Sequence, residues 1–203
     1  MKNEISKLFG IDSESFNIAT GIVIEYENNY LFSIQNKEKW KQVNGIYYIG
    51  LVGIGGGCDE QESIDMCLER ECIEEIGECV KIIDEIETYV IERQDYKKII
   101  KINFLQKIPY AITLVKNKEP YKGKLYTVVC SYRAVLEKLP NIKDIYGFII
   151  FDKKNISKIK IDGMSYSEWK NMGTDFITKG SIPENSFLIP FGTFKTFLDL
   201  HKK

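Results

Sequence analysis

The sequence predicts a mixed α/β or α+β domain, and three observations indicate this class. Strand-like runs rich in β-branched residues recur along the chain, one helix is well marked, and a glycine-rich loop leads directly into that helix. There is no internal repeat, low-complexity tract or Pro/Gly/Ser-rich linker. We therefore expect a single domain over residues 1–203, with a short N-terminal extension over about 1–15 and a helical C-terminal segment over about 188–203.

A β-hairpin is expected in the first part of the chain. Phe16–Tyr26 is rich in β-branched residues, the pair Asn28 and Asn29 supplies a turn, and residues 30–35 return as the second strand. A second apolar stretch over 46–54 then runs into three consecutive glycines at 55–57.

The helix that follows the glycines is predicted over residues 63–76. Gly77 follows it, at the position where a left-handed C-terminal cap is favoured. Beyond this helix the sequence predicts strands over 80–92, 99–105, 125–132 and 146–152.

A helix is also predicted near the C-terminus, where Pro190 suits a helix start. Phe191, Phe194, Phe197 and Leu198 recur after it at helical spacing. We expect all four to form an apolar face that packs on the rest of the domain.

Composition argues against several classes of protein. The formal net charge of −1 disfavours a protein that binds long DNA, because such domains usually carry a basic excess. No run approaches the roughly 18 apolar residues of a membrane span. The five cysteines are odd in number and have no C-x-x-C spacing, which suits free thiols in a reducing cytoplasm. We therefore expect a cytoplasmic protein with neither DNA nor a membrane as its partner.

The single histidine limits the chemistry that the chain can perform. It is His201, close to the C-terminus, where chains tend to fray. Ser-His-Asp and Cys-His catalysis and histidine-rich metal sites are therefore disfavoured. Acid–base chemistry is expected from carboxylates, lysine, tyrosine or metal-bound water.

The predicted helix and the loop before it are strongly acidic, with nine acids and one base, Arg70, between Asp59 and Glu78. On a helix Glu71 faces Glu74 at i+3 and Glu75 at i+4, and like charges at this spacing cost roughly 0.2–0.5 kcal/mol per pair. Arg70 is expected to help only partly, by reaching Glu74. An acidic helix alone can be a solvated face and a glycine triplet alone a loop. Together they favour a Mg²⁺ or Mn²⁺ site that the three glutamates share beside the glycines.

This segment resembles the Nudix box, GX5EX7REUXEEXGU, in which U is a bulky apolar residue. All seven fully specified positions are matched, by Gly56, Glu62, Arg70, Glu71, Glu74, Glu75 and Gly77. If each residue type occurs at roughly 6%, a chance match at a given start is on the order of 10⁻⁹. Cys72 and Glu78 depart from the two apolar positions and leave the charged positions untouched.

The resemblance to Nudix hydrolases implies an α/β/α sandwich with a mixed sheet and a catalytic loop–helix–loop. It also implies an enzyme that hydrolyses a phosphoanhydride in a nucleoside diphosphate linked to another group, by attack of water at phosphorus. The metal ligands would be Glu71, Glu74, Glu75 and the carbonyl of Gly55. The catalytic residues would be Glu71, Arg70 and Glu62. Arg70 would orient a catalytic glutamate by a bidentate ion pair, and Glu62 would support the site.

Further site residues are expected around this core. Gly56 and Gly57 would lie against the substrate, and Trp40, Tyr47 and Tyr96 are either substrate contacts or packing residues. The general base is either Glu71 or a residue of a later loop, for which the candidates are Asp144, Glu119 and Asp95.

Two other functions stay open. The first is a Nudix-like domain that binds a nucleotide without cleaving it. The second is an RNA-cap pyrophosphohydrolase, because eight lysines and one acid lie within residues 97–124. We expect that stretch to be the solvated side of strands and the partner to be a small nucleotide-type molecule rather than RNA. A homodimer would also be consistent with the resemblance.

Overall fold

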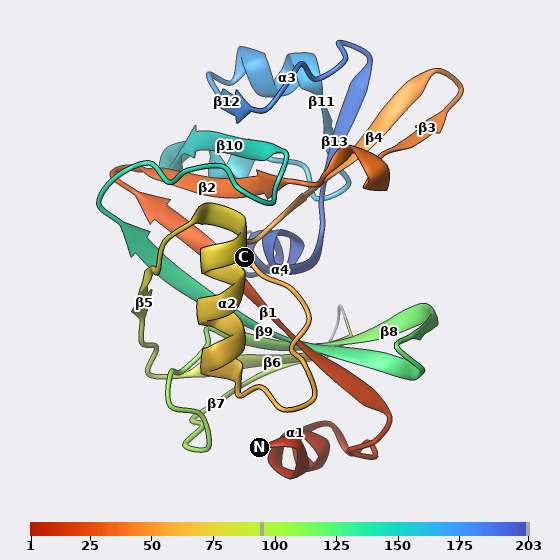
Figure 1. Ribbon diagram of the computed structural model, residues 1–203, viewed down its shortest axis with the longest axis vertical. Helices are drawn as coiled ribbons and strands as arrows, with labels where there is room; N and C mark the ends of the chain where they lie inside the picture. The colour runs from red at the N-terminus through yellow and green to blue at the C-terminus, as the bar shows by residue number, and fades with distance from the viewer. Residues whose placement is uncertain (94–95, 202–203) are drawn as a thin grey trace.

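The computed structural model describes residues 1–93 and 96–201 and shows an α+β fold around one mixed sheet (Figure 1). The strands are β1 (Phe16–Tyr26), β2 (Asn29–Ile34), β3 (Lys41–Val43), β4 (Ile46–Val52), β5 (Lys81–Ile83), β6 (Thr88–Arg93), β7 (Tyr96–Ile100), β8 (Ala111–Tyr121), β9 (Lys124–Leu136), β10 (Gly147–Asp152), β11 (Met164–Ser165), β12 (Asp175–Thr178) and β13 (Ser186–Pro190). The helices are α1 (Lys2–Phe9), α2 (Ile64–Ile76), α3 (Tyr166–Asn171) and α4 (Gly192–His201), with 3-10 turns η1 (Lys37–Lys39) and η2 (Lys153–Lys158).

Strand β1 lies near the middle of the sheet. The main path runs β11-β13-β4-β2-β1-β9-β8-β6-β7. β1 pairs in parallel with β9 along its full length and antiparallel with β2 at its C-terminal end only. The fold class expected from the sequence, with a mixed sheet, is therefore confirmed.

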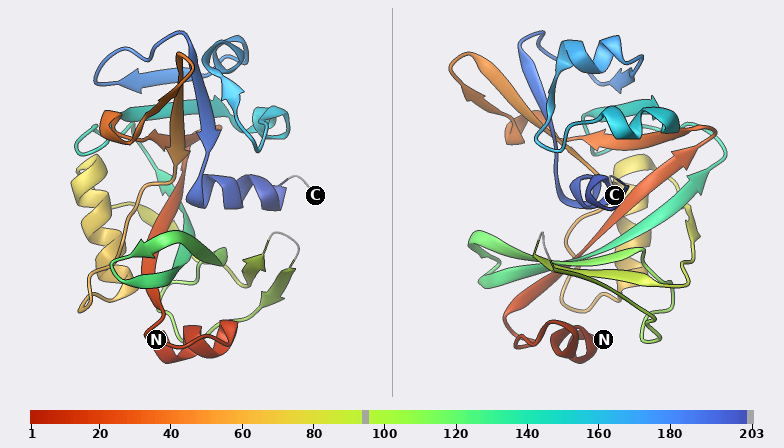
Figure 2. Two further views of the ribbon diagram at one scale, coloured as in Figure 1. Left: turned by 90° about the vertical axis from the view of Figure 1, so that its right-hand side faces the viewer. Right: turned by 180° about the vertical axis from the view of Figure 1, so that it is seen from behind.

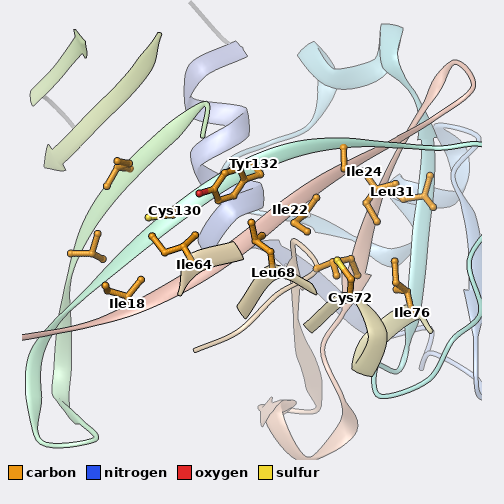
Figure 3. Packing of buried hydrophobic residues seen from close by; sticks show 14 of the residues in the cluster. Ile18, Ile22, Ile24, Leu31, Ile64, Leu68, Cys72, Ile76, Cys130 and Tyr132 are labelled. Atoms are coloured by element: carbon orange, nitrogen blue, oxygen red, sulfur yellow. The ribbon is translucent and has the colours of Figure 1, made fainter. Parts of the chain in front are cut away.

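Helices α2 and α4 cover opposite faces of β1, which gives the layered arrangement seen from the side in Figure 2. On one face, α2 buries side chains at a regular spacing of four residues, at Ile64, Leu68, Cys72 and Ile76. Figure 3 shows them against side chains of β1 and β9. Complete burial of such side chains stabilises the fold by about 1.5–3 kcal/mol each, which holds α2 in place.

The ends of α2 are set by its sequence. Ser63 is the N-cap, and its hydroxyl accepts a hydrogen bond from the Met66 N–H at 3.2 Å. Gly77 has a left-handed φ of 77°, and its N–H bonds back to the carbonyls of Cys72 and Ile73. The helix predicted over 63–76 is confirmed.

On the other face, α4 packs through aromatic side chains. Phe194 stacks on Phe32, with ring centroids 3.6 Å apart, and Phe197 and Leu198 are fully buried. Where α4 crosses β1, Gly21 has no side chain, and a Cβ there would overlap the side chain of Thr193. The helix therefore lies directly on strand backbone.

The prediction that Phe191 belongs to this apolar face is wrong. Phe191 precedes α4 and is 60% exposed. Its N–H donates to the Leu51 carbonyl at 2.8 Å, so its backbone continues the pairing of β13 with β4. Gly192 then has a positive φ of 52°, which separates Phe191 from the helical backbone.

Several other boundaries differ from the prediction. The strand expected over 80–92 is two strands, β5 and β6, because residues 84–87 leave the sheet. The strand expected over 99–105 is β7, which ends at Ile100. Strand β8 and helix α1 lie where no element is expected, and α1 buries Ile5 and Phe9 in the same core as α2.

None of the helices built from residues 1–93 and 96–201 combines the length and the apolar character needed to cross a membrane.

Candidate active site

The glycine loop is held in place by backbone hydrogen bonds to β1. Gly56 accepts a bond from the Thr20 N–H at 2.9 Å, and the Cys58 N–H donates to the Ile18 carbonyl at 2.9 Å. Residues 54–58 therefore run antiparallel beside β1, with bridges at both ends of this short segment. Backbone hydrogen bonds to β1 therefore hold the loop without a contribution from side chains.

Two of the three glycines are required by close approach. Gly55 has a φ of 139°, and a Cβ there would overlap the backbone of Thr20. A Cβ at Gly56 would lie 2.5 Å from Oε1 of Glu71. At Gly57 the nearest atom would be 3.7 Å away, at the Tyr121 hydroxyl, so this position has room for a side chain. The Glu71 carboxylate therefore lies directly against the loop backbone.

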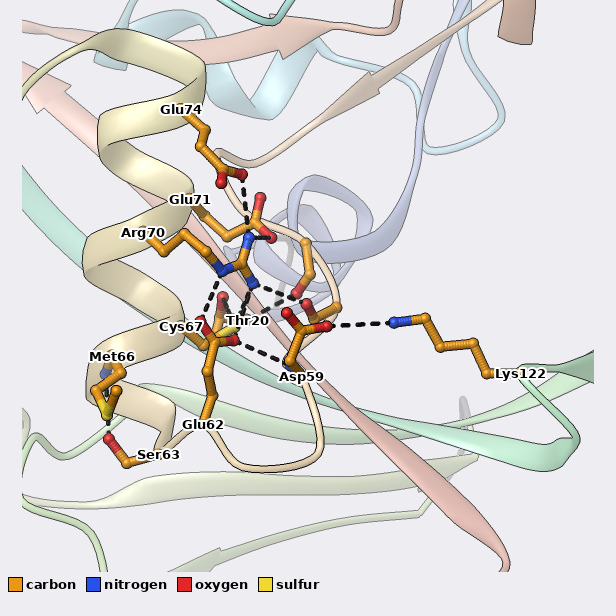
Figure 4. Close-up of polar contacts among 12 residues, drawn as sticks. Thr20, Asp59, Glu62, Ser63, Met66, Cys67, Arg70, Glu71, Glu74 and Lys122 are labelled. Carbon is orange, nitrogen blue, oxygen red and sulfur yellow. Dashed lines mark hydrogen bonds and ion pairs between the residues drawn. The ribbon is translucent and has the colours of Figure 1, made fainter.

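Arg70 is the centre of the charged side chains on α2, as Figure 4 shows. Its Nε and Nη2 donate to the two oxygens of Glu62, at 2.6 and 3.0 Å. Its Nη1 donates to Glu71 at 2.7 Å and to Glu74 at 3.1 Å. Nη2 also donates to the Gly57 carbonyl at 3.0 Å.

The predicted contact of Arg70 with Glu74 is present, and Arg70 also bonds to Glu62 and Glu71. Spacing along the helix does not reveal the contact with Glu62, because Glu62 reaches Arg70 from the loop before the helix. The bidentate pair expected between Arg70 and a catalytic glutamate is formed with Glu62.

Glu62 is held in its charged form. Its hydrogen bonds with Arg70, and then the bond that it accepts from the Asp59 N–H at 3.0 Å, lower the pKa of Glu62 to about 2. The hydrogen bonds that Arg70 donates to Glu62 and Glu71 raise the pKa of Arg70. This pair is an ionised link between the loop and the helix.

Glu71 and Glu75 have the opposite character, because both are largely removed from solvent. Burial raises the pKa of Glu75 to about 8, although its Oε2 accepts a hydrogen bond from the Gly55 N–H at 3.0 Å. Burial also raises the pKa of Glu71, against the opposing effect of Arg70. Two buried carboxylates near each other favour a bound cation.

A cavity of about 530 Å³ lies in front of these two glutamates. The glycine loop, β1, η1 and the start of α4 form its walls. Its acidic wall residues are Glu38, Glu71, Glu75 and Asp144, and among the described wall residues Lys39 is the only base. The cavity therefore combines four acids with one lysine.

The predicted ion site for three glutamates is not formed. In the described parts of the chain, no three His, Cys, Asp or Glu side chains are grouped closely enough to hold a metal ion. Glu74 is half exposed, bonds to Arg70 and does not line the cavity. Glu71 and Glu75 do line it, and Mg²⁺ in nucleotide sites usually takes one or two carboxylates together with water and phosphate oxygens. The donor set of this cavity therefore fits a hard divalent cation through two glutamates.

Comparisons with known proteins give structural matches alone. No protein-family model matches the chain, and no curated protein matches it. A Nudix-family hydrolase from Clostridium perfringens matches at 16% identity and a TM-score of 0.45, over 71% of this chain and 86% of that one. A MutT protein from Methanosarcina mazei matches at 11% identity and a TM-score of 0.43, over 71% and 83%. The E. coli dihydroneopterin triphosphate pyrophosphohydrolase matches at 12% identity and a TM-score of 0.39, over 64% and 77%.

At these identities and TM-scores the matches carry no argument about activity or substrate. The resemblance to the Nudix box therefore rests on the seven matched positions of the sequence, which the structure folds as one loop and one helix beside a cavity.

The structure places the three candidates for a general base outside the box differently. Asp144 lines the cavity, and its N–H donates to the Glu74 carbonyl at 3.2 Å. Glu119 is exposed on β8 and does not line the cavity. Asp95 lies outside the described residues. Asp144 is thus the candidate that the fold brings to Glu71 and Glu75.

Two of the three aromatic candidates, Trp40 and Tyr47, do not line the cavity. Trp40 donates from Nε1 to the Gln35 carbonyl at 2.6 Å and packs edge-on against Tyr146. Tyr47 contacts Trp40, and neither side chain lines the cavity. Tyr96 lies on β7, and its side chain is outside the described part. Trp40 and Tyr47 are packing residues in this structure.

Among the described residues, no lysine of the stretch 97–124 lines the cavity at the box. Lys122 does reach the box, where it pairs with Asp59 at 3.7 Å, and Lys124 pairs with Glu14 at 3.4 Å. The base that lines the cavity, Lys39, comes from η1 instead. Lys39 and residues 191–193 were not predicted to line the cavity, because the sequence around them contains no motif that places them near the box.

Proposed function

We propose that this protein hydrolyses a phosphoanhydride bond in a nucleoside diphosphate linked to another group, with Mg²⁺ or Mn²⁺ bound by Glu71 and Glu75. The observation that carries the proposal is the position of these two box carboxylates. They lie at a cavity wall against a glycine loop, and burial raises the pKa of each. A cation beside them would offset that burial and meet the charge of a diphosphate.

The site residues have distinct tasks in this proposal. A bound metal would neutralise the diphosphate and acidify a coordinated water. Lys39, which lines the same cavity, binds phosphate oxygens, and the glycine loop lets the substrate approach the backbone. Arg70 and Glu62 hold the loop and helix together so that Glu71 keeps its position. Asp144 accepts a proton from the attacking water.

A screen of purified protein with Mg²⁺ or Mn²⁺ tests the proposal. The panel contains nucleoside triphosphates, nucleotide sugars, ADP-ribose, NADH, coenzyme A and dinucleoside polyphosphates, with products identified by mass. In ¹⁸O-labelled water, label should enter a phosphate group, because water attacks phosphorus. Glu75→Gln should lower the rate by about 10³-fold or more.

The matched control is Glu69→Gln, which changes an exposed glutamate on the same helix and should leave the rate unchanged. Turnover that persists in Glu75→Gln, or that a chelator does not abolish, contradicts the proposal.

A second candidate, a domain that binds a nucleotide without cleaving it, is favoured by one observation. Arg70 bonds to Glu62, Glu71 and Glu74, so each of these three acids has a charged hydrogen-bond donor without a metal ion. Saturable binding of a nucleotide with equal affinity in Mg²⁺ and in EDTA, without any product, would select this candidate. Binding that requires metal would reject it.

A further inference from the structure

A second cavity, of about 630 Å³, lies next to the cavity at the Nudix box. The two cavities share wall residues Val129, Phe191 and Gly192. The second cavity is formed by β8, β9, the end of β13 and α4, and its walls are mostly apolar, as at Leu114 and Ile189. One elongated molecule can therefore occupy both spaces by passing Phe191.

Phe191 has an unusual position for its residue type. Of the 11 phenylalanines, all of them in the described part of the chain, it is the only exposed one, at 60%. Its backbone is nevertheless fixed by the hydrogen bond to Leu51. An exposed ring on a fixed backbone at the junction of two cavities is a ready surface for stacking.

The polar groups in the second cavity suit a neutral ring better than another phosphate. Acids and bases are both present, namely Glu92, Asp162 and Asp199 with Lys116 and Lys195, so the described walls carry no excess of positive charge. Thr127 donates to Asn117 Oδ1 at 3.1 Å, and Asn117 Nδ2 donates to the Lys124 carbonyl at 3.1 Å. An amide nitrogen carries two hydrogens, so Asn117 keeps one for the edge of a ring.

We propose that the second cavity binds a flat heteroaromatic ring of the substrate, of the kind found in nucleobases, with Phe191 as its stacking face. The diphosphate of the same molecule lies in the first cavity, against Glu71, Glu75 and Lys39. This inference rests on the proposed function for the placement of the diphosphate. It deepens that function by assigning the ring of the substrate to a specific cavity.

Calorimetry with probes that cannot be hydrolysed tests the inference independently of turnover. The α,β-methylene analogues of adenosine, guanosine, uridine and cytidine diphosphate carry the ring, and methylenediphosphonate lacks it. At least one nucleoside analogue should bind more tightly than methylenediphosphonate in Mg²⁺. Phe191→Ala should weaken that binding by about tenfold to a hundredfold, because the stacking contact is lost. Phe191→Trp should preserve it, and methylenediphosphonate should bind all three proteins equally.

A second variant approaches the same cavity from another wall. Ile161→Trp adds bulk to the lining of the second cavity and should abolish the preference for the ring without changing the binding of methylenediphosphonate. Ile73→Ala, at an exposed apolar residue of α2, is the control and should change neither affinity.

The inference is overturned if no nucleoside analogue binds more tightly than methylenediphosphonate, or if Phe191→Ala and Ile161→Trp leave the preference unchanged. The proposed function fails separately. Ring-dependent binding that requires Phe191, in a protein without turnover, supports the inference and rejects hydrolysis. Turnover with an unchanged KM in Phe191→Ala supports the proposed hydrolysis and rejects the inference.

Discussion

Arg70 and Glu62 form a bidentate ion pair that joins helix α2 to the loop before it, with donor–acceptor distances of 2.6 and 3.0 Å. The same guanidinium also reaches Glu71, Glu74 and the Gly57 carbonyl. One side chain therefore contacts three glutamates and the glycine loop.

Arg70→Lys is expected to damage both activity and stability. A lysine has a single ammonium and cannot reproduce the paired hydrogen bonds to Glu62. The rate should fall by roughly tenfold to a hundredfold, and the free energy of unfolding by about 1–2 kcal/mol. Turnover assays and denaturant unfolding measure the two effects.

The matched control is Arg133→Lys. Arg133 forms a comparable ion-paired group with Glu25 and Glu85, which do not line the cavity of the box. It should lose stability while keeping its rate. Equal losses of rate in both variants would contradict a specific role for Arg70.

Gly56→Ala and Gly57→Ala are expected to differ sharply although they are neighbours. A Cβ at Gly56 would lie 2.5 Å from Glu71 Oε1 and must displace that carboxylate. A shift of about 1 Å at a reacting group can cost roughly a hundredfold in rate. A Cβ at Gly57 meets nothing closer than 3.7 Å, so this variant should keep most of its activity. Similar rates in the two variants would show that the position of Glu71 is unimportant.

Acid should remove the stabilising effect of Glu62. The folded pKa of Glu62 is about 2, below its ordinary value of 4.5, so the folded state favours the carboxylate. The resulting stabilisation is present above the unfolded pKa and is lost as the pH falls from about 4.5 towards 2.

The difference in Tm between wild type and Glu62→Gln should therefore be constant above about pH 5 and shrink below it. Glu69→Gln, on the exposed side of α2, should show no comparable change. A Tm difference for Glu62→Gln that does not depend on pH would contradict the ion pair.

Asp144→Asn is expected to lower the rate by roughly 10²- to 10⁴-fold, because Asp144 alone among the described base candidates outside the box lines the cavity. Glu119→Gln is the control, since Glu119 is exposed on β8. Initial rates of the two variants are compared at saturating substrate. If Asp144→Asn and Glu119→Gln are both fully active, Glu71 and Asp95 are the remaining candidates.

The parts of the fold that local sequence determines could be predicted. Strand β1 and helix α2 match their predictions because β-branched residues, the Ser63 N-cap and the Gly77 C-cap act within a few residues. Strand β8 was not predictable in the same way, because its exposed half, including Lys116 and Lys118, has the composition of a loop.

The site could be predicted only in part, for a related reason. The box spacing identifies Glu71 and Glu75, but the contact of Arg70 with Glu62 depends on how the loop folds back. Asp144, Lys39 and Phe191 come to the cavity from distant parts of the chain, through pairing of β10 with β2 and of β13 with β4. A pattern read along a single segment carries no information about such pairing.

The absence of a side chain at Gly21 has a consequence for the spacing between helix and strand. Thr193 of α4 lies on the strand backbone at this point, while the backbone N–H of the preceding residue of β1, Thr20, bonds to the glycine loop. A larger residue at position 21 would have to displace Thr193, which lines the same cavity as Glu71 and Glu75. The shape of that cavity therefore depends on a strand position that carries no side chain.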